Sequence, residues 1–137
     1  MNKKRIALIA HDHKKDDLVE WTVFNESKLA QCTLIATGTT GGLLEKALDR
    51  QVTKLNSGPF GGDQQIGALI SEGKVDALIF FWDPLHPLPH DQDIKALLRI
   101  AVLWNIPVAC NRTTADFIIS SPLFFGEYER KQPDLKI

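Results

Sequence analysis

Short apolar runs alternate along the chain with longer stretches of helical periodicity. Four of these runs predict buried strands, over Ile6–Ala10, Thr33–Ala36, Ala77–Phe81 and Pro107–Cys110. Because polar residues do not alternate within them, both faces of each strand are expected to be covered, as is typical of a parallel sheet. A weaker strand is expected over Val52–Asn56.

Apolar residues spaced three and four apart predict helices between these strands. The expected buried stripes are Leu44, Ala47 and Leu48; Ile66, Leu69 and Ile70; and Ile94, Leu97, Leu98 and Ala101. A last helix is expected over Thr114–Ser120, capped by Thr113 or Thr114. Strands and helices in this order predict one α/β domain over residues 1–137: a three-layer, doubly wound, mostly parallel sheet of about five strands with helices on both faces.

Charge and composition exclude several classes of partner. The chain has 137 residues, and its 16 Lys+Arg and 17 Asp+Glu give a net charge of -1, so no basic field for nucleic acid or an anionic membrane is expected. The apolar run after Lys3-Lys4-Arg5 stops at His11, too soon for a signal peptide, and none reaches the roughly 20 residues of a spanning helix. Cys32 and Cys110 form neither a disulfide framework nor a metal-binding spacing. A cytoplasmic protein is predicted.

Polar and glycine-rich segments follow the predicted strands, and the rule for open parallel sheets places them together. They are His11-Asp12-His13, Thr37–Gly42, Ser57-Gly58-Pro59, Asp63 and Asp83–Asp93. Ligands of such sheets bind at the carboxyl ends of the strands, near the point where the strand order reverses. These residues, distant in sequence, are therefore expected to face one cleft.

The segment Thr37–Gly42 has the composition of a phosphate-binding loop, although it matches neither G-x-G-x-x-G nor the P-loop pattern. Glycines allow backbone amides to converge on an oxyanion at a helix N-terminus, and the three threonines add hydroxyl donors. The alternative is a simple turn with a threonine cap. Ser57-Gly58, a second small turn with a hydroxyl, favours the phosphate interpretation. Either Lys15 or Lys14 can supply a positive charge.

The carboxylate of Asp63 stands where the turn Gly61-Gly62 leads into a predicted amphipathic helix. Such an aspartate is a helix cap, a catalytic base, or both. The choice stays open from this position alone, since most aspartates at helix starts are only caps. The surrounding loops and the downstream histidine and aspartates favour a catalytic role.

The segment Asp83–Asp93 has three prolines and is expected to be a stiff loop. Within it, Asp91 is interpreted as a cap of the following helix. His90 and Asp93 have a second interpretation, because a histidine held beside carboxylates can donate a hydrogen bond to a developing enolate oxygen. The alternative is a rigid surface connector with no chemical role.

A metal site built from His11, His13 and His90 with nearby aspartates is a less favoured alternative. Neither H-E-x-x-H nor a cysteine ligand pair is present, so no metal is predicted. Cys110, at the end of a predicted strand, is interpreted as a buried thiol rather than a nucleophile.

These motifs together resemble the methylglyoxal synthase family. The matching segments are Ala10–His13, Ala36–Gly41, Ser57–Pro59, Gly61–Gln65, Phe80–Leu85 and Pro89–Asp91, and the resemblance extends from about Ile6 to Pro122. It implies a homohexamer that converts dihydroxyacetone phosphate to methylglyoxal and inorganic phosphate, with no metal or organic cofactor. It also implies phosphate as product and allosteric inhibitor, although the tail beyond Ser121 is shorter than is usual in the family.

The resemblance also assigns roles to residues. It implies that Asp63 is the catalytic base, His90 a ligand of the substrate oxygen and Asp93 a supporting carboxylate. The implied substrate and phosphate contacts are His11, Lys15, Thr37, Gly38, Thr39, Thr40, Ser57 and Gly58, with Asp12 and Asp83 as organisers behind them. The same fold resembles the regulatory domain of carbamoyl-phosphate synthetases, so a non-catalytic module that senses phosphorylated metabolites is the alternative. Asp63 with His90 and Asp93 favours the enzyme.

Overall fold

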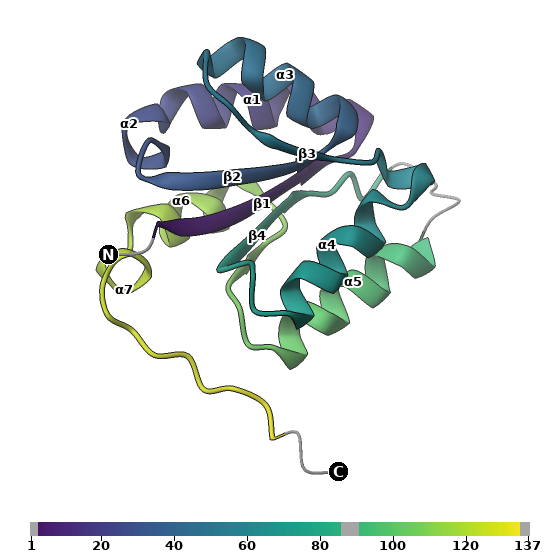
Figure 1. The fold of residues 1–137 in the computed structure, drawn as a ribbon. Helices are drawn as coiled ribbons and strands as arrows, with labels where there is room; N and C mark the ends of the chain where they lie inside the picture. The colour runs from purple at the N-terminus through teal and green to yellow at the C-terminus, as the bar shows by residue number, and fades with distance from the viewer. Residues whose placement is uncertain (1–2, 86–90, 135–137) are drawn as a thin grey trace.

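The computed structural model describes residues 3–85 and 91–134, with the side chains of residues 91–93 left out. Five parallel strands form one sheet in the order β3-β2-β1-β4-β5 (Figure 1). The strands are β1 (Lys4–Ala10), β2 (Cys32–Thr37), β3 (Thr53–Leu55), β4 (Ala77–Phe81) and β5 (Val108–Ala109). The expected doubly wound parallel sheet is therefore confirmed.

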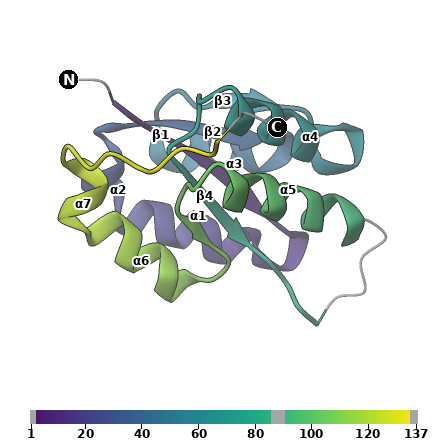
Figure 2. The same cartoon turned by 90° about the horizontal axis from the view of Figure 1, so that it is seen from below.

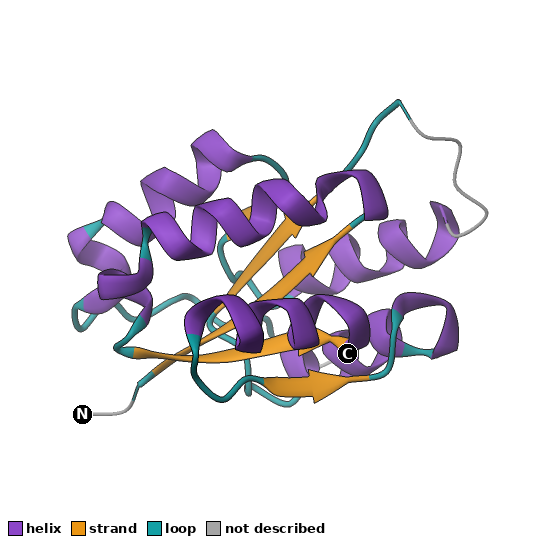
Figure 3. Ribbon diagram, turned by 90° about the horizontal axis from the view of Figure 1, so that it is seen from above, coloured by secondary structure: helices purple, strands orange, loops and turns teal. Residues whose placement is uncertain are grey.

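The helices fill the connections between the strands, as Figure 3 shows. They are α1 (Lys15–Phe24), α2 (Glu26–Leu29), α3 (Gly38–Leu48), α4 (Gly62–Ser71), α5 (Asp91–Leu103), α6 (Arg112–Ser120) and α7 (Pro122–Phe125), with short 3-10 turns η1 (Asp12–Lys14) and η2 (Gly58–Phe60). None of the described helices is long and apolar enough to cross a membrane.

Alternate residues of the central strand enter two separate cores, which explains why its run Ile6–Ala10 is apolar throughout. In β1, Ile6 and Leu8 join one core with residues of α1, α3, α6 and α7, whereas Ala7 and Ile9 join the other with residues of α4 and α5. Successive side chains of a strand point to opposite faces of the sheet, so both faces need apolar residues. In Figure 2, α6 lies beside α1, and the Trp21 indole N–H donates to Asp116 Oδ1 at 2.8 Å between these helices.

Three details of the sequence interpretation are wrong. Ala47 is exposed, because the buried stripe of α3 runs through Gly41, Leu44 and Leu48 instead. Helix α6 begins at Arg112 rather than Thr114. Its cap is Asn111, whose side-chain oxygen accepts from the Thr114 amide at 2.9 Å.

The third wrong detail concerns the segment Thr37–Gly42, which the sequence predicts to be a loop. Thr37 is the last residue of β2, and Gly38 already begins α3. The strand passes into the helix with no intervening turn, so the small residues form the first turn of the helix.

Candidate active site

A cavity of about 420 Å³ lies at the carboxyl edge of the sheet, where the expected cleft was placed. The strand order reverses between β1 and β4, since the chain builds β2 and β3 on one side of β1 and then crosses to the other. The cavity is lined by Ile9, Ala10, His11, Asp12, Lys15, Thr37, Thr39, Thr40, Ser57, Gly58, Pro59, Asp63, Phe80 and Ile94. Residues that follow β1, β2 and β3 thus meet in one place, as predicted.

Asp63 lies in this cavity as the second residue of α4, with only 9% of its surface exposed. The cap position belongs to Gly61, whose φ of 99° is a left-handed conformation that favours glycine. The interpretation of Asp63 as the cap residue is therefore wrong. Its carboxylate lies against the turn that follows β3, since a Cβ added at Gly58 would stand 3.6 Å from Asp63 Oδ1.

Close packing explains why the second residue of the Gly61-Gly62 pair is a glycine. A Cβ at this position would overlap the carbonyl oxygen of Asn56 and stand 2.9 Å from Thr37 Cγ2. The start of α4 is consequently packed against the backbone that follows β3. The Gln65 side chain secures the same contact, because its Oε1 accepts from the Asn56 amide at 2.8 Å. This packing sets the position of Asp63.

The first turn of α3 forms the other wall of the cavity. The Gly38 amide donates to the Asn56 carbonyl at 3.3 Å, and a Cβ at Gly38 would stand 3.1 Å from the Ser57 amide nitrogen. Thr37 and Thr40 are buried, at 5% and 2% exposure. The Gly38 amide is thus already used. Because the other first-turn amides of a helix lack intrahelical acceptors, this wall offers these amides and the threonine hydroxyls as donors to an anion.

Lys15 and Asp12 supply the charge at the rim. Lys15 Nζ donates to Asp12 Oδ1 at 2.7 Å, and Lys15 lines the cavity whereas Lys14 does not. The choice between the two lysines, left open by the sequence, thus falls on Lys15. The hydrogen bond and the charge of Lys15 lower the pKa of the Asp12 carboxyl, so Asp12 remains an anion down to acidic pH.

Asp83 connects the ends of β1 and β4. Its backbone N–H donates to His11 Nδ1 at 2.9 Å, and its Oδ1 accepts from the Leu85 amide at 3.0 Å. Its Oδ2 lies 3.4 Å from Nδ1 of His13, which is exposed and does not line the cavity. Because Nδ1 of His11 accepts a hydrogen bond, the neutral ring carries its proton on Nε2 and can donate from that atom.

The side chains of two residues named from the sequence lie outside the described part of the chain. His90 lies outside the described residues. Asp93 belongs to the first turn of α5, but its side chain is outside the described part, as is that of Asp91. The next residue, Ile94, lines the cavity, so the beginning of α5 borders the site.

The apolar wall of the cavity was missed by sequence reasoning. Ile9, Phe80 and Ile94 line it, yet the sequence offers only their membership of buried strands and a helix. No pattern in the sequence separates an apolar residue that ends in a core from one that borders a cavity.

Two alternatives considered from the sequence are a metal site and a reactive Cys110 thiol. No group of three or more His, Cys, Asp or Glu within residues 3–85 and 94–134 is arranged to hold a metal ion. Cys110, interpreted from the sequence as a buried thiol, is half-buried. Burial raises the pKa of this thiol, which makes it a poor nucleophile.

Comparison with known proteins agrees with this geometry. The model of the MGS-like domain matches residues 17–110. Methylglyoxal synthase of Pseudoalteromonas atlantica is 62% identical over 133 residues, covering 96% of this chain and 98% of that protein; that of Erwinia tasmaniensis is 59% identical, covering 98% and 89%. The crystal structure of methylglyoxal synthase from Elizabethkingia anophelis NUHP1 has a TM-score of 0.92 and 53% identity, covering 98% of this chain and 88% of that one. The chain therefore belongs to the methylglyoxal synthase family.

Proposed function

We propose that this chain is a phosphate-eliminating lyase that converts dihydroxyacetone phosphate to methylglyoxal and inorganic phosphate. One observation carries the proposal: a buried carboxylate, Asp63, shares a cavity with the helix turn that offers amide and hydroxyl donors to an anion. The names of the relatives agree with it. A module that only senses phosphorylated metabolites needs the anion site but no buried carboxylate beside it.

In the first step, Asp63 removes a proton from the carbon that bears the free hydroxyl. The electron pair of the broken C–H bond forms the carbon–carbon double bond of an enediolate. A carboxylate is a weak base for a carbon acid, so donors around the developing oxyanion must lower the barrier. We assign this task to His90, with Asp93 as supporting carboxylate, and to the Nε2 proton of His11, which the Asp83 amide holds in place.

In the second step, the bond between carbon and the ester oxygen breaks, and inorganic phosphate leaves with the electron pair. The resulting enol aldehyde tautomerises to methylglyoxal. We propose that Thr37, Thr39 and Thr40, with Ser57 and Gly58, bind the phosphate through amides and hydroxyls at the N-terminus of α3. Gly38, which the resemblance also implies, does not line the cavity, and its amide already donates to the Asn56 carbonyl. Lys15 adds a positive charge, oriented by Asp12. No metal or organic cofactor has a part in these steps.

The decisive experiment follows both products when the purified chain is incubated with dihydroxyacetone phosphate. Methylglyoxal, trapped as its quinoxaline derivative, and inorganic phosphate are expected in equal amounts. An enediolate that is reprotonated instead yields glyceraldehyde 3-phosphate and no phosphate, and this outcome would contradict the proposed elimination. Binding of the substrate with no product at all would favour the sensing module.

Replacing Lys15 by Gln is expected to raise KM for the triose phosphate about tenfold, since a charged hydrogen bond to a bound anion is lost. The matched control is Lys14→Gln, which removes an equal charge from the neighbouring residue. The Lys14 side chain does not line the cavity. Steady-state kinetics of both variants provide the test. Equal effects of the two changes would show that only the general positive field matters.

The Thr40→Val variant tests the phosphate wall separately from charge. Valine nearly preserves the shape of the buried Thr40 side chain and removes its hydroxyl, so KM is expected to rise about fivefold with a smaller effect on folding. Thr53→Val, on the exposed surface of β3, is the control. Unchanged kinetics for Thr40→Val would remove this hydroxyl from the phosphate site.

The remaining properties implied by the family are proposals about assembly, regulation and location. We propose that residues 1–137 form a single domain and that the chain assembles into a homohexamer. We also propose that inorganic phosphate inhibits it allosterically and that the protein is cytoplasmic. Large apolar side chains exposed on the isolated chain, among them Phe24, Phe60 and Leu85 at 80%, 78% and 91%, support self-association. Light scattering of the purified protein measures the assembly directly.

A further inference from the structure

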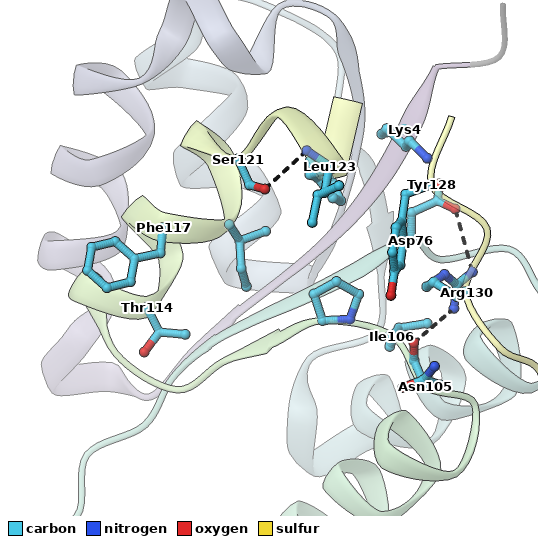
Figure 4. Close-up of a pocket in the computed structure, with 13 residues that line it drawn as sticks. Lys4, Asp76, Asn105, Ile106, Thr114, Phe117, Ser121, Leu123, Tyr128 and Arg130 are labelled. Carbon is cyan, nitrogen blue, oxygen red and sulfur yellow. Dashed lines mark hydrogen bonds and ion pairs between the residues drawn. The ribbon is translucent and has the colours of Figure 1, made fainter. Parts of the chain in front are cut away.

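A second cavity, of about 410 Å³, lies at the amino edge of the sheet, at the opposite end of the strands from the site described above (Figure 4). It is bordered by the first residue of β1, by the segments that lead into β4 and β5, by α6 and α7, and by the chain after α7. It shares no lining residue with the carboxyl-edge cavity. A ligand here would therefore leave the proposed active site unobstructed.

The walls of this cavity are mostly apolar, and part of the apolar surface remains exposed. Ile106 and Ile118 line the inside, while Leu123 and Tyr128 at the rim are 62% and 56% exposed. An exposed apolar concavity of a few hundred Å³ is the usual form of a site for a small organic molecule.

Two of the charged groups in the wall already have partners within the chain. Asp76 Oδ2 accepts from the Arg5 amide at 2.7 Å and from Arg5 Nε at 3.2 Å. Arg130 Nη1 donates to the Trp104 carbonyl at 3.2 Å, and Nη2 lies 4.0 Å from Asp76 Oδ1. These groups hold the wall together, and Asp76 offsets the charge of one of the two arginines beside it.

Lys4 is different. Its ammonium lies 5.9 Å from the centre of the Phe124 ring, and no carboxylate in the described part of the chain comes within the 4.0 Å of an ion pair. A cation with only an aromatic partner, at the edge of an apolar cavity, is complementary to a molecule with an apolar body and one negative group.

We propose that this amino-edge cavity binds a small monocarboxylate with an aromatic or branched apolar body, its carboxylate paired with Lys4. The ligand lies along the apolar wall between α6 and the chain after α7, with Tyr128 covering it from the rim. The inference is independent of the proposed lyase activity, because it rests on a separate cavity.

The test is calorimetric titration of the full chain with 3-phenylpropionate and with its neutral isostere 3-phenylpropanamide. A fragment of this size is expected to bind with a Kd of about 1 mM. The amide is expected to bind about tenfold more weakly. In Lys4→Gln that difference should disappear, whereas in the neighbouring control Lys3→Gln it should persist. Equal affinity of acid and amide for the parent chain, or no binding of either, would overturn the proposal.

Two further variants locate the binding. Tyr128→Ser, in the segment after α7, is expected to weaken binding of 3-phenylpropionate several-fold. The control Phe24→Ser removes an exposed aromatic ring that does not line this cavity and should have no effect. Weaker binding in Lys15→Gln would place the acid in the carboxyl-edge cavity and contradict the proposal. Loss of oligomer mass in Tyr128→Ser alone would assign this surface to a second copy of the chain, and would contradict it equally.

Discussion

Replacing Asp63 by Asn is expected to lower kcat by about 10²- to 10⁴-fold, the range in which a positioned general base contributes. This corresponds to about 3–5 kcal/mol of the activation barrier. The amide has nearly the shape of the carboxylate, so the packing of α4 against the Asn56 backbone stays in place. What is lost is the ability to accept a proton from carbon.

Three measurements separate this loss from a structural defect. The affinity for inorganic phosphate should stay within about twofold of the parent value, since the phosphate donors belong to α3 and to the Ser57-Gly58 turn. Exchange of substrate protons with deuterated solvent should stop together with product formation. The control Asp49→Asn changes an exposed residue at φ 48°, a conformation that asparagine accepts, and should leave kcat unchanged. A near-parental rate of phosphate release in Asp63→Asn would remove this residue from the role of base.

Replacing Gly62 by Ala is expected to reduce the free energy of unfolding by about 3 kcal/mol, at the upper end of what overpacking costs. The added methyl group overlaps the Asn56 carbonyl and stands 2.9 Å from Thr37 Cγ2, so the backbone itself must shift to make room. Activity should fall as well, because Asp63 is the next residue.

Gly67→Ala is the matched control, in the same helix. Among the described residues, a Cβ at Gly67 would meet only Leu97 Cδ1, at 3.9 Å, an ordinary van der Waals contact. Since alanine is the better helix former by about 1 kcal/mol, this variant should be as stable as the parent or more so. Urea denaturation of both variants supplies the comparison. Equal stabilities would mean that the backbone around Asn56 yields more easily than its packing indicates.

The sheet could be predicted because parallel strands covered on both faces leave a plain signal. The run Ala77–Phe81 is apolar throughout and coincides with β4. Helix α1 gave no such signal, since its buried residues Leu18, Trp21 and Thr22 are followed by the exposed Val23 and Phe24. The position of the cap of α6 depends on where β5 ends. Because β5 has only two residues, its end does not indicate whether Asn111, Thr113 or Thr114 is the cap.

The site could be predicted in composition but not in geometry. A rule about strand ends brings His11, Thr37 and Ser57 together, and the structure confirms that they line one cavity. The choice of Lys15 over Lys14 depends on the direction in which α1 begins, which the sequence does not encode locally. The contact that makes Gly62 necessary involves a backbone oxygen six residues away, so no pattern of side chains reveals it. The roles of His90 and Asp93 stay predictions.

The hydrogen bond between the Asp83 amide and His11 joins residues 72 positions apart. It requires the pairing of β1 with β4, the more distant in sequence of the two strand pairings that β1 makes. Closing so long a stretch of chain is slow compared with the formation of a helix, because chain entropy is lost before the contacts between the strands can stabilise the structure. During refolding, helical structure should consequently return well before the cleft becomes able to bind a substrate.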